Sequence, residues 1–340
     1  MSAAETTRVV AVQLAVRLGE VDANLRHIED VIGQAVREHQ PRMLFLPEVS
    51  TTPNVCHPAM RTCALPVDGA ALALYRRLAR EHDCVIGAGA LTIRGRDTFN
   101  TYYVVEPDGT AHLHDKDQPS MWENAFYAAG RDEGIAATAA GPIGVANGFE
   151  WIRTRTAARL RGRVRLLAGG MCFPSFPQWS LTRPWFWDRD HATMLQLARE
   201  TPGRMARLVG VPAVHPSHVG AITMRTPMIN AIAWPTIMLG ETQITDASGR
   251  SLGRLAYEDG EGWVAADVEL TEPRPLDPLP GSFWNTSLPA SVHAVWHLCN
   301  THGRLSYGWR RARGRHPWQQ DAGYGADLPG VAQAQRAERG

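Results

Sequence analysis

Residues 42–48, RMLFLPE, decide the fold, because they form an apolar strand that stops abruptly at a proline and a glutamate. Continuous apolar runs of this length are typical of strands buried on both faces. A similar run, VVAVQL, occupies 9–14, and CVIGAG follows at 84–89. Apolar residues at helical spacing over 25–36 and an Ala/Leu-rich segment ending near 82 place a helix in each gap. This alternation predicts an α/β fold with a parallel sheet and crossover helices.

The rest of the chain continues with shorter elements. Asp22 and Asp68 are expected to cap the first two helices. Pro107-Asp108-Gly109 predicts a hairpin turn, and Asp246-Ala247-Ser248-Gly249 predicts another near the end of the domain. We expect strands at 99–105, 110–114, 143–146, 164–168, 211–214 and 263–268, and helices at 150–161 and from 188 towards 208, the latter interrupted at Pro202.

Composition indicates one globular domain with an extension. Of 340 residues, 44% are hydrophobic and 20% charged, which is ordinary for a globular protein. Prolines dominate residues 273–280, so we place the main domain at 1–270 and an extension at 271–340. The extension is rich in Trp, His and Arg and is expected to form an interface or a lid, with a disordered tail from about 321.

Charge and cysteine content exclude several classes of protein. The net charge of +1 gives no field to attract nucleic acid or an anionic membrane. Arginines and aromatic residues alternate over 304–318, but the run is short, and an interface or lid is the better interpretation. The chain lacks a long apolar run and begins with a short polar segment, so a cytoplasmic protein is expected. The five cysteines are odd in number and widely scattered, and no two form a C-x-x-C pair, so neither a disulfide framework nor a zinc site is expected.

Lys116 is the only lysine in a chain with 35 basic side chains. Arginine is the rule in this protein, and a site that needs a compact ammonium cannot use the broad guanidinium. Lys116 is therefore a candidate functional residue.

Several motifs occur in the order found in the nitrilase, or carbon–nitrogen hydrolase, superfamily. LFLPE (44–48) resembles the motif of the general-base glutamate, and HDKDQ (114–118) resembles the lysine motif. WENAFYAAG (122–130) is similar to a stretch that carries a second glutamate, IGVANGFEW (143–151) resembles the nucleophile motif, and LGETQITDASGRSLG (239–253) matches the closing hairpin.

The resemblance implies an αββα four-layer sandwich that hydrolyses small amides, nitriles or N-carbamoyl compounds with a Glu–Lys–Cys triad and no cofactor or metal. It assigns the base to Glu48 and the oxyanion stabiliser to Lys116. Glu123 is expected to position substrate or the other carboxylate, although it lies closer to the lysine than the pattern suggests. A homo-oligomer with a small-molecule substrate is also expected.

The nucleophile motif departs from the family at one position. Gly148, flanked by Phe149 and Glu150, stands where the resemblance requires cysteine. Glycine cannot attack, so the chain is an engineered inactive variant, a natural binding protein, or an enzyme whose nucleophile has moved. Cys172 ends the next predicted strand and is the candidate replacement, with activated water as the other.

Three functions remain open from the sequence. The first is a carbon–nitrogen hydrolase with Glu48 and Lys116 in their family roles. The second is a catalytically inactive binding or scaffold protein, and the third a non-hydrolytic acid–base enzyme in the same pocket. Gly148, Phe149, Glu150 and His215 are expected to line the substrate pocket. His215-Pro-Ser-His218 has a metal-like spacing, but no neighbouring ligand completes a site.

Overall fold

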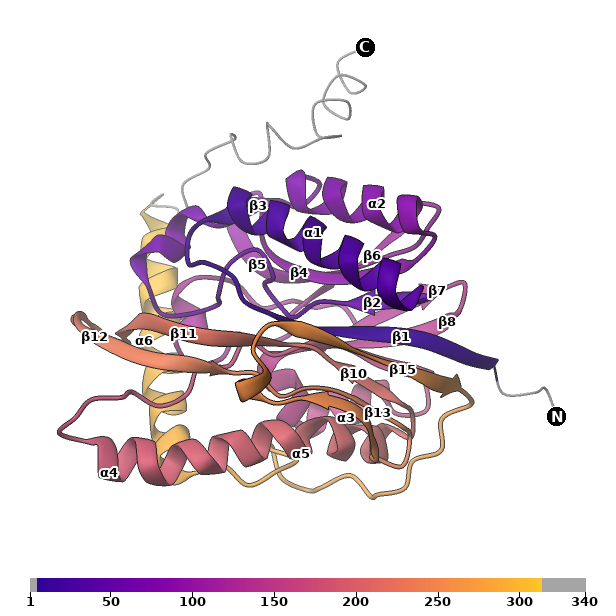
Figure 1. Cartoon of the computed structure of the whole chain (residues 1–340). Helices are drawn as coiled ribbons and strands as arrows, with labels where there is room; N and C mark the ends of the chain where they lie inside the picture. The colour runs from indigo at the N-terminus through magenta and orange to yellow at the C-terminus, as the bar shows by residue number, and fades with distance from the viewer. Residues whose placement is uncertain (1–4, 314–340) are drawn as a thin grey trace, which may run out of the picture.

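Two β-sheets lie face to face in the computed structural model, which describes residues 5–313 (Figure 1). The first sheet has the strand order β12-β11-β1-β2-β4-β5-β6, with β15 also paired to β1 and β3 to β4. Its strands are β1 (Glu5–Leu14), β2 (Met43–Phe45), β3 (Leu65–Pro66), β4 (Val85–Arg94), β5 (Asp97–Val105), β6 (Ala111–Asp115), β11 (Ser217–Thr226), β12 (Ile229–Leu239) and β15 (Gly262–Leu270).

The second sheet has the order β14-β13-β10-β9-β8-β7. Its strands are β7 (Ile135–Thr138), β8 (Gly141–Asn147), β9 (Leu166–Gly170), β10 (Ala213–His215), β13 (Thr242–Thr245) and β14 (Ser251–Leu255). The helices are α1 (Val21–His39), α2 (Ala70–His82), α3 (Thr154–Leu160), α4 (Arg183–Trp185), α5 (Ala192–Val209) and α6 (Ala290–Ala312). Short helical turns are η1 (Pro58–Thr62), η2 (Met121–Ala125), η3 (Gly148–Ile152), η4 (Phe186–His191) and η5 (Tyr257–Asp259).

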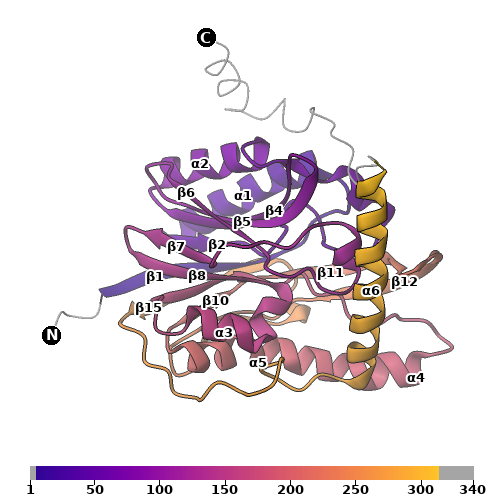
Figure 2. The same ribbon diagram turned by 180° about the vertical axis from the view of Figure 1, so that it is seen from behind.

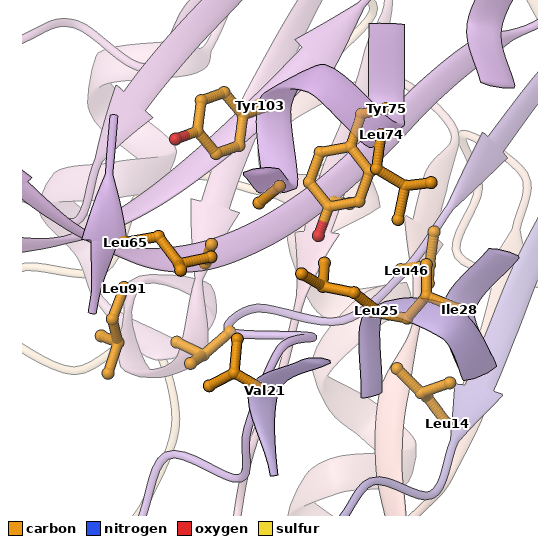
Figure 3. Packing of buried hydrophobic residues seen from close by; sticks show 14 of the residues in the cluster. Leu14, Val21, Leu25, Ile28, Leu46, Leu65, Leu74, Tyr75, Leu91 and Tyr103 are labelled. Atoms are coloured by element: carbon orange, nitrogen blue, oxygen red, sulfur yellow. The ribbon is translucent and has the colours of Figure 1, made fainter. Parts of the chain in front are cut away.

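Three hydrophobic cores hold the layers together. The first joins α1 and α2 to the first sheet, with Leu25 and Ile28 of α1 packed near Leu46 (Figure 3). The second joins α3 and α5 to the second sheet, and the third fills the space between the sheets, where Phe45 and Val145 are both fully or almost fully buried. Burying one large aliphatic or aromatic side chain contributes roughly 1.5–3 kcal/mol. These cores give the predicted αββα sandwich.

The predicted parallel strands are confirmed by their register. Val9 of β1 lies opposite Met43 of β2, and Met43 lies opposite Val85 of β4. The hairpin predicted around Pro107 is also present, as β5 and β6. No helix within residues 5–313 is both long and apolar enough to cross a membrane.

Several local predictions were wrong. Asp22 lies inside the first turn of α1, whose N-cap is Glu20, and Gly69 rather than Asp68 caps α2. The helix predicted over 150–161 is divided into η3 and α3. Pro202 does not interrupt α5, because buried residues on both sides of it hold the helix against the second sheet and offset one missing hydrogen bond. The long β11–β12 hairpin was missed.

The extension contributes α6, which runs along one end of the sandwich and crosses its layers (Figure 2). Asn124 Nδ2 donates to Asn300 Oδ1 over 2.5 Å, and a Cβ at Gly303 would lie 2.8 Å from the Cβ of Asn124. Helix α6 is therefore packed closely on η2. The tail predicted from about 321 lies outside the described residues.

Candidate active site

Four sequence candidates follow the ends of strands. Glu48 comes after β2, Lys116 directly follows β6, Gly148 directly follows β8, and Cys172 comes after β9. Strands β8 and β9 are parallel, with Asn147 opposite Gly170, so their carboxyl ends meet at one edge. The two sheets thus bring all four residues to the same rim of the sandwich.

Lys116 is buried between two carboxylates. Its Nζ lies 2.8 Å from Glu123 Oε1 and 3.3 Å from Glu48 Oε2. Burial alone would lower the pKa of Lys116, but the charges of Glu123 and Glu48 outweigh it and raise the pKa above its ordinary value. The side chain is an ammonium ion whose direction is fixed by two ion pairs.

Glu48 is also buried and accepts two further hydrogen bonds. Asn100 Nδ2 donates to its Oε2 over 2.8 Å, and the backbone N–H of Cys172 donates to Oε1 over 3.1 Å. Burial raises the pKa of Glu48 to about 7, against the opposing effect of Lys116. A carboxyl group with this pKa exchanges protons near neutral pH, as a general base requires.

Glu123 is held rigidly by its own turn and by a loop. The backbone N–H of Ser120 donates to Oε2 over 2.6 Å, and Asn54 Nδ2 donates to Oε1 over 2.7 Å. The 3₁₀ turn η2 brings Glu123 back towards Lys116, which explains how a residue so near in sequence reaches the lysine. Asn54, Asn100 and Ser120 were missed because no motif singles them out.

Gly148 faces this charged cluster, and a side chain there would have to displace the ends of Glu48 and Lys116. A Cβ built on Gly148 would lie 2.7 Å from Lys116 Nζ and still closer to Glu48 Oε1. Its φ of +54° is a left-handed conformation that disfavours residues with a side chain. The ends of Glu48 and Lys116 therefore occupy the space that a side chain at 148 would need.

Cys172 is close to Glu48 through its backbone, whereas its thiol faces a different group. The backbone N–H of Asn54 donates to Cys172 Sγ over 2.9 Å. Burial and the charge of Glu48 raise the pKa of this thiol well above its usual range. Cys172 lies on the predicted rim and is held as a neutral thiol.

Glu150 was predicted to line the substrate pocket, and the structure places it beneath the rim instead. Its Oε2 accepts from the backbone N–H of Asn147 over 2.8 Å, and its Oε1 from that of Asp117 over 3.2 Å. It also pairs with His114 at 2.8 Å and Arg159 at 3.3 Å. Because these partners surround it, Glu150 ties the Gly148 turn to the Lys116 segment rather than contacting the pocket.

His114 completes this buried network. Its Nδ1 lies 2.5 Å from Asp132 and its Nε2 2.8 Å from Glu150. Burial would lower the pKa of His114, but Glu150 and Asp132 outweigh it and raise the pKa to about 9. The imidazolium therefore bridges two carboxylates under the candidate site.

His215, which was expected to line the substrate pocket, lies in the core. It is fully buried and packs edge-to-face against Trp151, with ring centroids 4.7 Å apart. Burial lowers the pKa of His215 to about 3, so it is a neutral core residue. The neighbouring His218 donates from Nε2 to the Glu48 carbonyl over 2.9 Å and thereby fixes the backbone that carries the glutamate.

A small cavity opens beside the charged cluster. Phe149 borders it and packs edge-to-face on Phe173. The complete lining is Glu48, Lys116, Ser120, Met121, Trp122, Glu123, Gly148, Phe149, Cys172, Phe173 and Pro174. Within residues 5–313, no group of three or more His, Cys, Asp or Glu side chains is arranged to hold a metal ion.

Most of the chain is similar to proteins of a known family. The family model for carbon–nitrogen hydrolase matches residues 8–272. No curated protein shows significant sequence similarity.

Similar structures include a carbon–nitrogen hydrolase from Helicobacter pylori, with a TM-score of 0.64 and 17% identity over 78% of this chain and 90% of that one. A mutant of a Nesterenkonia amidase has a TM-score of 0.57 and 16% identity over 77% and 91%. Nit3 of Saccharomyces cerevisiae has a TM-score of 0.56 and 17% identity over 78% and 90%. The chain belongs to the carbon–nitrogen hydrolase family.

Proposed function

We propose that this protein hydrolyses a small amide, nitrile or N-carbamoyl compound by direct attack of water, with Glu48 as base and Lys116 as oxyanion stabiliser. The observation that carries the proposal is the position of Lys116, buried between Glu48 and Glu123 and bordering a cavity. A buried ammonium with two fixed carboxylates is costly to maintain unless its charge is used.

The proposal takes Gly148 as the replacement of the family's cysteine. In the Nesterenkonia amidase, fluoroacetamide adds covalently at an active site cysteine. Here Gly148 occupies the turn after β8, and its missing side chain would point at Glu48 and Lys116. A thiol at this position would stand between the base and the ammonium, which is the arrangement that nucleophilic catalysis requires.

Cys172 is a poor substitute for that thiol. Its Sγ accepts a hydrogen bond from Asn54, and only its backbone N–H contacts Glu48. A thiol with a strongly raised pKa carries almost no thiolate at neutral pH, and thiolate is the attacking form. We therefore assign the attack to water and give Cys172 the task of orienting Glu48 through its backbone.

The reaction then proceeds in two steps for an amide. The Glu48 carboxylate takes a proton from water while the water oxygen bonds to the carbonyl carbon, which leaves an oxyanion beside Lys116. The carbon–nitrogen bond breaks next, and the protonated Glu48 returns its proton to the departing nitrogen. A carboxylic acid and ammonia are released, and Glu48 is again a carboxylate.

Lys116 acts by electrostatic stabilisation of the oxyanion. Its ammonium is held in place before the reaction starts, so little reorganisation is needed as negative charge develops. Glu123 supports this role by fixing the direction of the lysine, since its own oxygens are engaged by Ser120 and Asn54.

The test is ammonia release from a panel of amides, nitriles and N-carbamoyl compounds. Glu48→Gln should lower turnover by about 10²–10⁴-fold, because an amide cannot accept the proton from water. Glu200→Gln, on the exposed surface of α5, is the matched control and should leave turnover unchanged. Turnover that survives Glu48→Gln would contradict the assignment of the base.

A binding protein is the second candidate. The observation that favours it is the direct contact of Lys116 with Glu48, which leaves no space for a nucleophile at Gly148. This candidate predicts ligand binding without ammonia release from any member of the panel.

A further inference from the structure

A second, shallow cavity adjoins the candidate active site and is open on one side. We propose that it receives an apolar substituent of the substrate, aromatic or branched aliphatic, and that Val292 and Val295 of α6 set its size. This inference rests on the proposed function in one respect, because that function places the reacting carbon–nitrogen group beside Lys116.

The two cavities have a common wall. Met121, Trp122, Phe173 and Pro174 border both of them. A ligand whose amide or nitrile group lies beside Lys116 therefore reaches the second cavity by passing these four side chains.

The lining of the second cavity is almost entirely apolar. It contains Met121, Trp122, Phe173, Pro174, Ser175, Phe176, Met194, Trp234, Val292 and Val295. The Ser175 hydroxyl is bonded to His191 Nδ1 at 2.7 Å, and the indole N–H of Trp234 donates to the Ser175 carbonyl over 3.2 Å. The polar groups of Ser175 and Trp234 are therefore engaged, and the buried indole N–H of Trp122 has no hydrogen-bond partner among the described residues.

Such a lining discriminates by charge and by size. A carboxylate or ammonium placed here would lose its hydration, and the lining holds no charged side chain to pair with it, which is strongly unfavourable. A phenyl ring or branched alkyl group gains from burial and from edge contacts with the aromatic side chains. The cavity therefore fits a neutral apolar group.

The two valines come from a helix that is already fixed in place. Ser291 Oγ donates to Asp190 Oδ2 over 3.0 Å beside the first of them, and Asn300 is bonded to Asn124 beyond the second. Val292 is buried and Val295 half-buried. Because α6 lies beyond the residues 8–272 that match the family model, this wall is supplied by the extension rather than by the shared domain.

Calorimetric titration of the full chain with three amides tests the inference. Phenylacetamide should bind at least about tenfold more tightly than acetamide, and succinamate, which carries a carboxylate, should bind no better than acetamide. Val295→Trp should fill the cavity and remove the preference for phenylacetamide while leaving acetamide binding unchanged. Leu298→Trp, on the exposed side of α6, is the matched control and should keep the preference.

Equal affinities for phenylacetamide and acetamide, absence of phenylacetamide binding, or an unchanged preference in Val295→Trp would overturn the inference. Because this experiment measures binding, its result does not depend on whether the protein hydrolyses the amide. A protein that prefers phenylacetamide yet releases no ammonia supports the cavity assignment and contradicts hydrolysis.

Discussion

Lys116 and Gly148 face each other so closely that a Cβ at Gly148 would lie 2.7 Å from the ammonium nitrogen. Glu48 and Lys116 thus close around a position without a side chain. The proposed mechanism therefore has a water molecule, rather than a fixed thiol, approach Glu48 from the cavity.

Activity should rise with pH through an apparent pKa of about 7. Burial raises the pKa of Glu48 to about 7, and only its deprotonated form can accept the proton from water. The measurement is kcat/KM against pH for the best substrate of the panel. A rising limb near the ordinary glutamate value of ~4.3 would show that Glu48 is not the titrating base.

Lys116→Arg should lower turnover by about 10²–10³-fold, the usual cost of losing one oxyanion donor. The planar guanidinium cannot take the place of an ammonium whose Nζ contacts Glu48 and Glu123 together. Steady-state ammonia release measures the effect, and circular dichroism shows whether the variant is folded. Folded Lys116→Arg with unaltered turnover would exclude the proposed role.

Gly148→Cys should create a thiol that iodoacetamide labels, whereas the five native cysteines, all buried, should resist labelling in the folded protein. The new side chain must push aside the flexible ends of Glu48 and Lys116, and the left-handed φ of +54° adds roughly 1–3 kcal/mol of strain. Gly148→Ala carries the same strain without the thiol and is the control. Intact-protein mass spectrometry gives the label count, and an unlabelled Gly148→Cys would place residue 148 away from the cavity.

His114→Asn should destabilise the protein most at acidic and neutral pH. The pKa of His114 is about 9 in the folded protein, above the value of ~6.5 expected when unfolded. Its contribution, on the order of 3 kcal/mol, is therefore fully present below pH ~6.5 and is lost as pH rises through about 9.

Urea unfolding across this range is the appropriate measurement. The stability difference between the unaltered chain and His114→Asn should shrink between pH 6.5 and 9. A difference that does not vary with pH would show that the imidazole carries no extra proton in the folded state.

The layers could be predicted because strands 9–14, 42–46 and 84–89 are apolar on both faces. Such strands are accommodated only in a sheet whose two faces are both covered by other layers of the fold. Glu48 and Lys116 could be found for a similar reason, since each follows a strand end. Asn54, Asn100 and Ser120 could not, because a hydrogen-bond partner in a loop or antiparallel strand leaves no periodic signal.

Two site residues lie elsewhere than expected, for identifiable physical reasons. Glu150 follows Gly148 by two residues, but the 3₁₀ turn η3 directs its side chain under the sheet to His114 and Arg159. His215 follows a buried strand run, yet it ends β10 facing Trp151 in the core. The homo-oligomer expected from the family stays a prediction.

In the proposed mechanism water attacks with the help of Glu48, and the Cys172 thiol takes no part. Ammonia release by Cys172→Ala compared with Glu48→Gln distinguishes the two nucleophiles, because the backbone N–H at 172 that orients Glu48 is kept in the alanine variant. Cys172→Ala is expected to retain turnover within about tenfold of the unaltered chain, while Glu48→Gln should lose about 10²–10⁴-fold. Loss of turnover in Cys172→Ala as severe as in Glu48→Gln, with an acyl adduct on Cys172 in the unaltered chain, would contradict it.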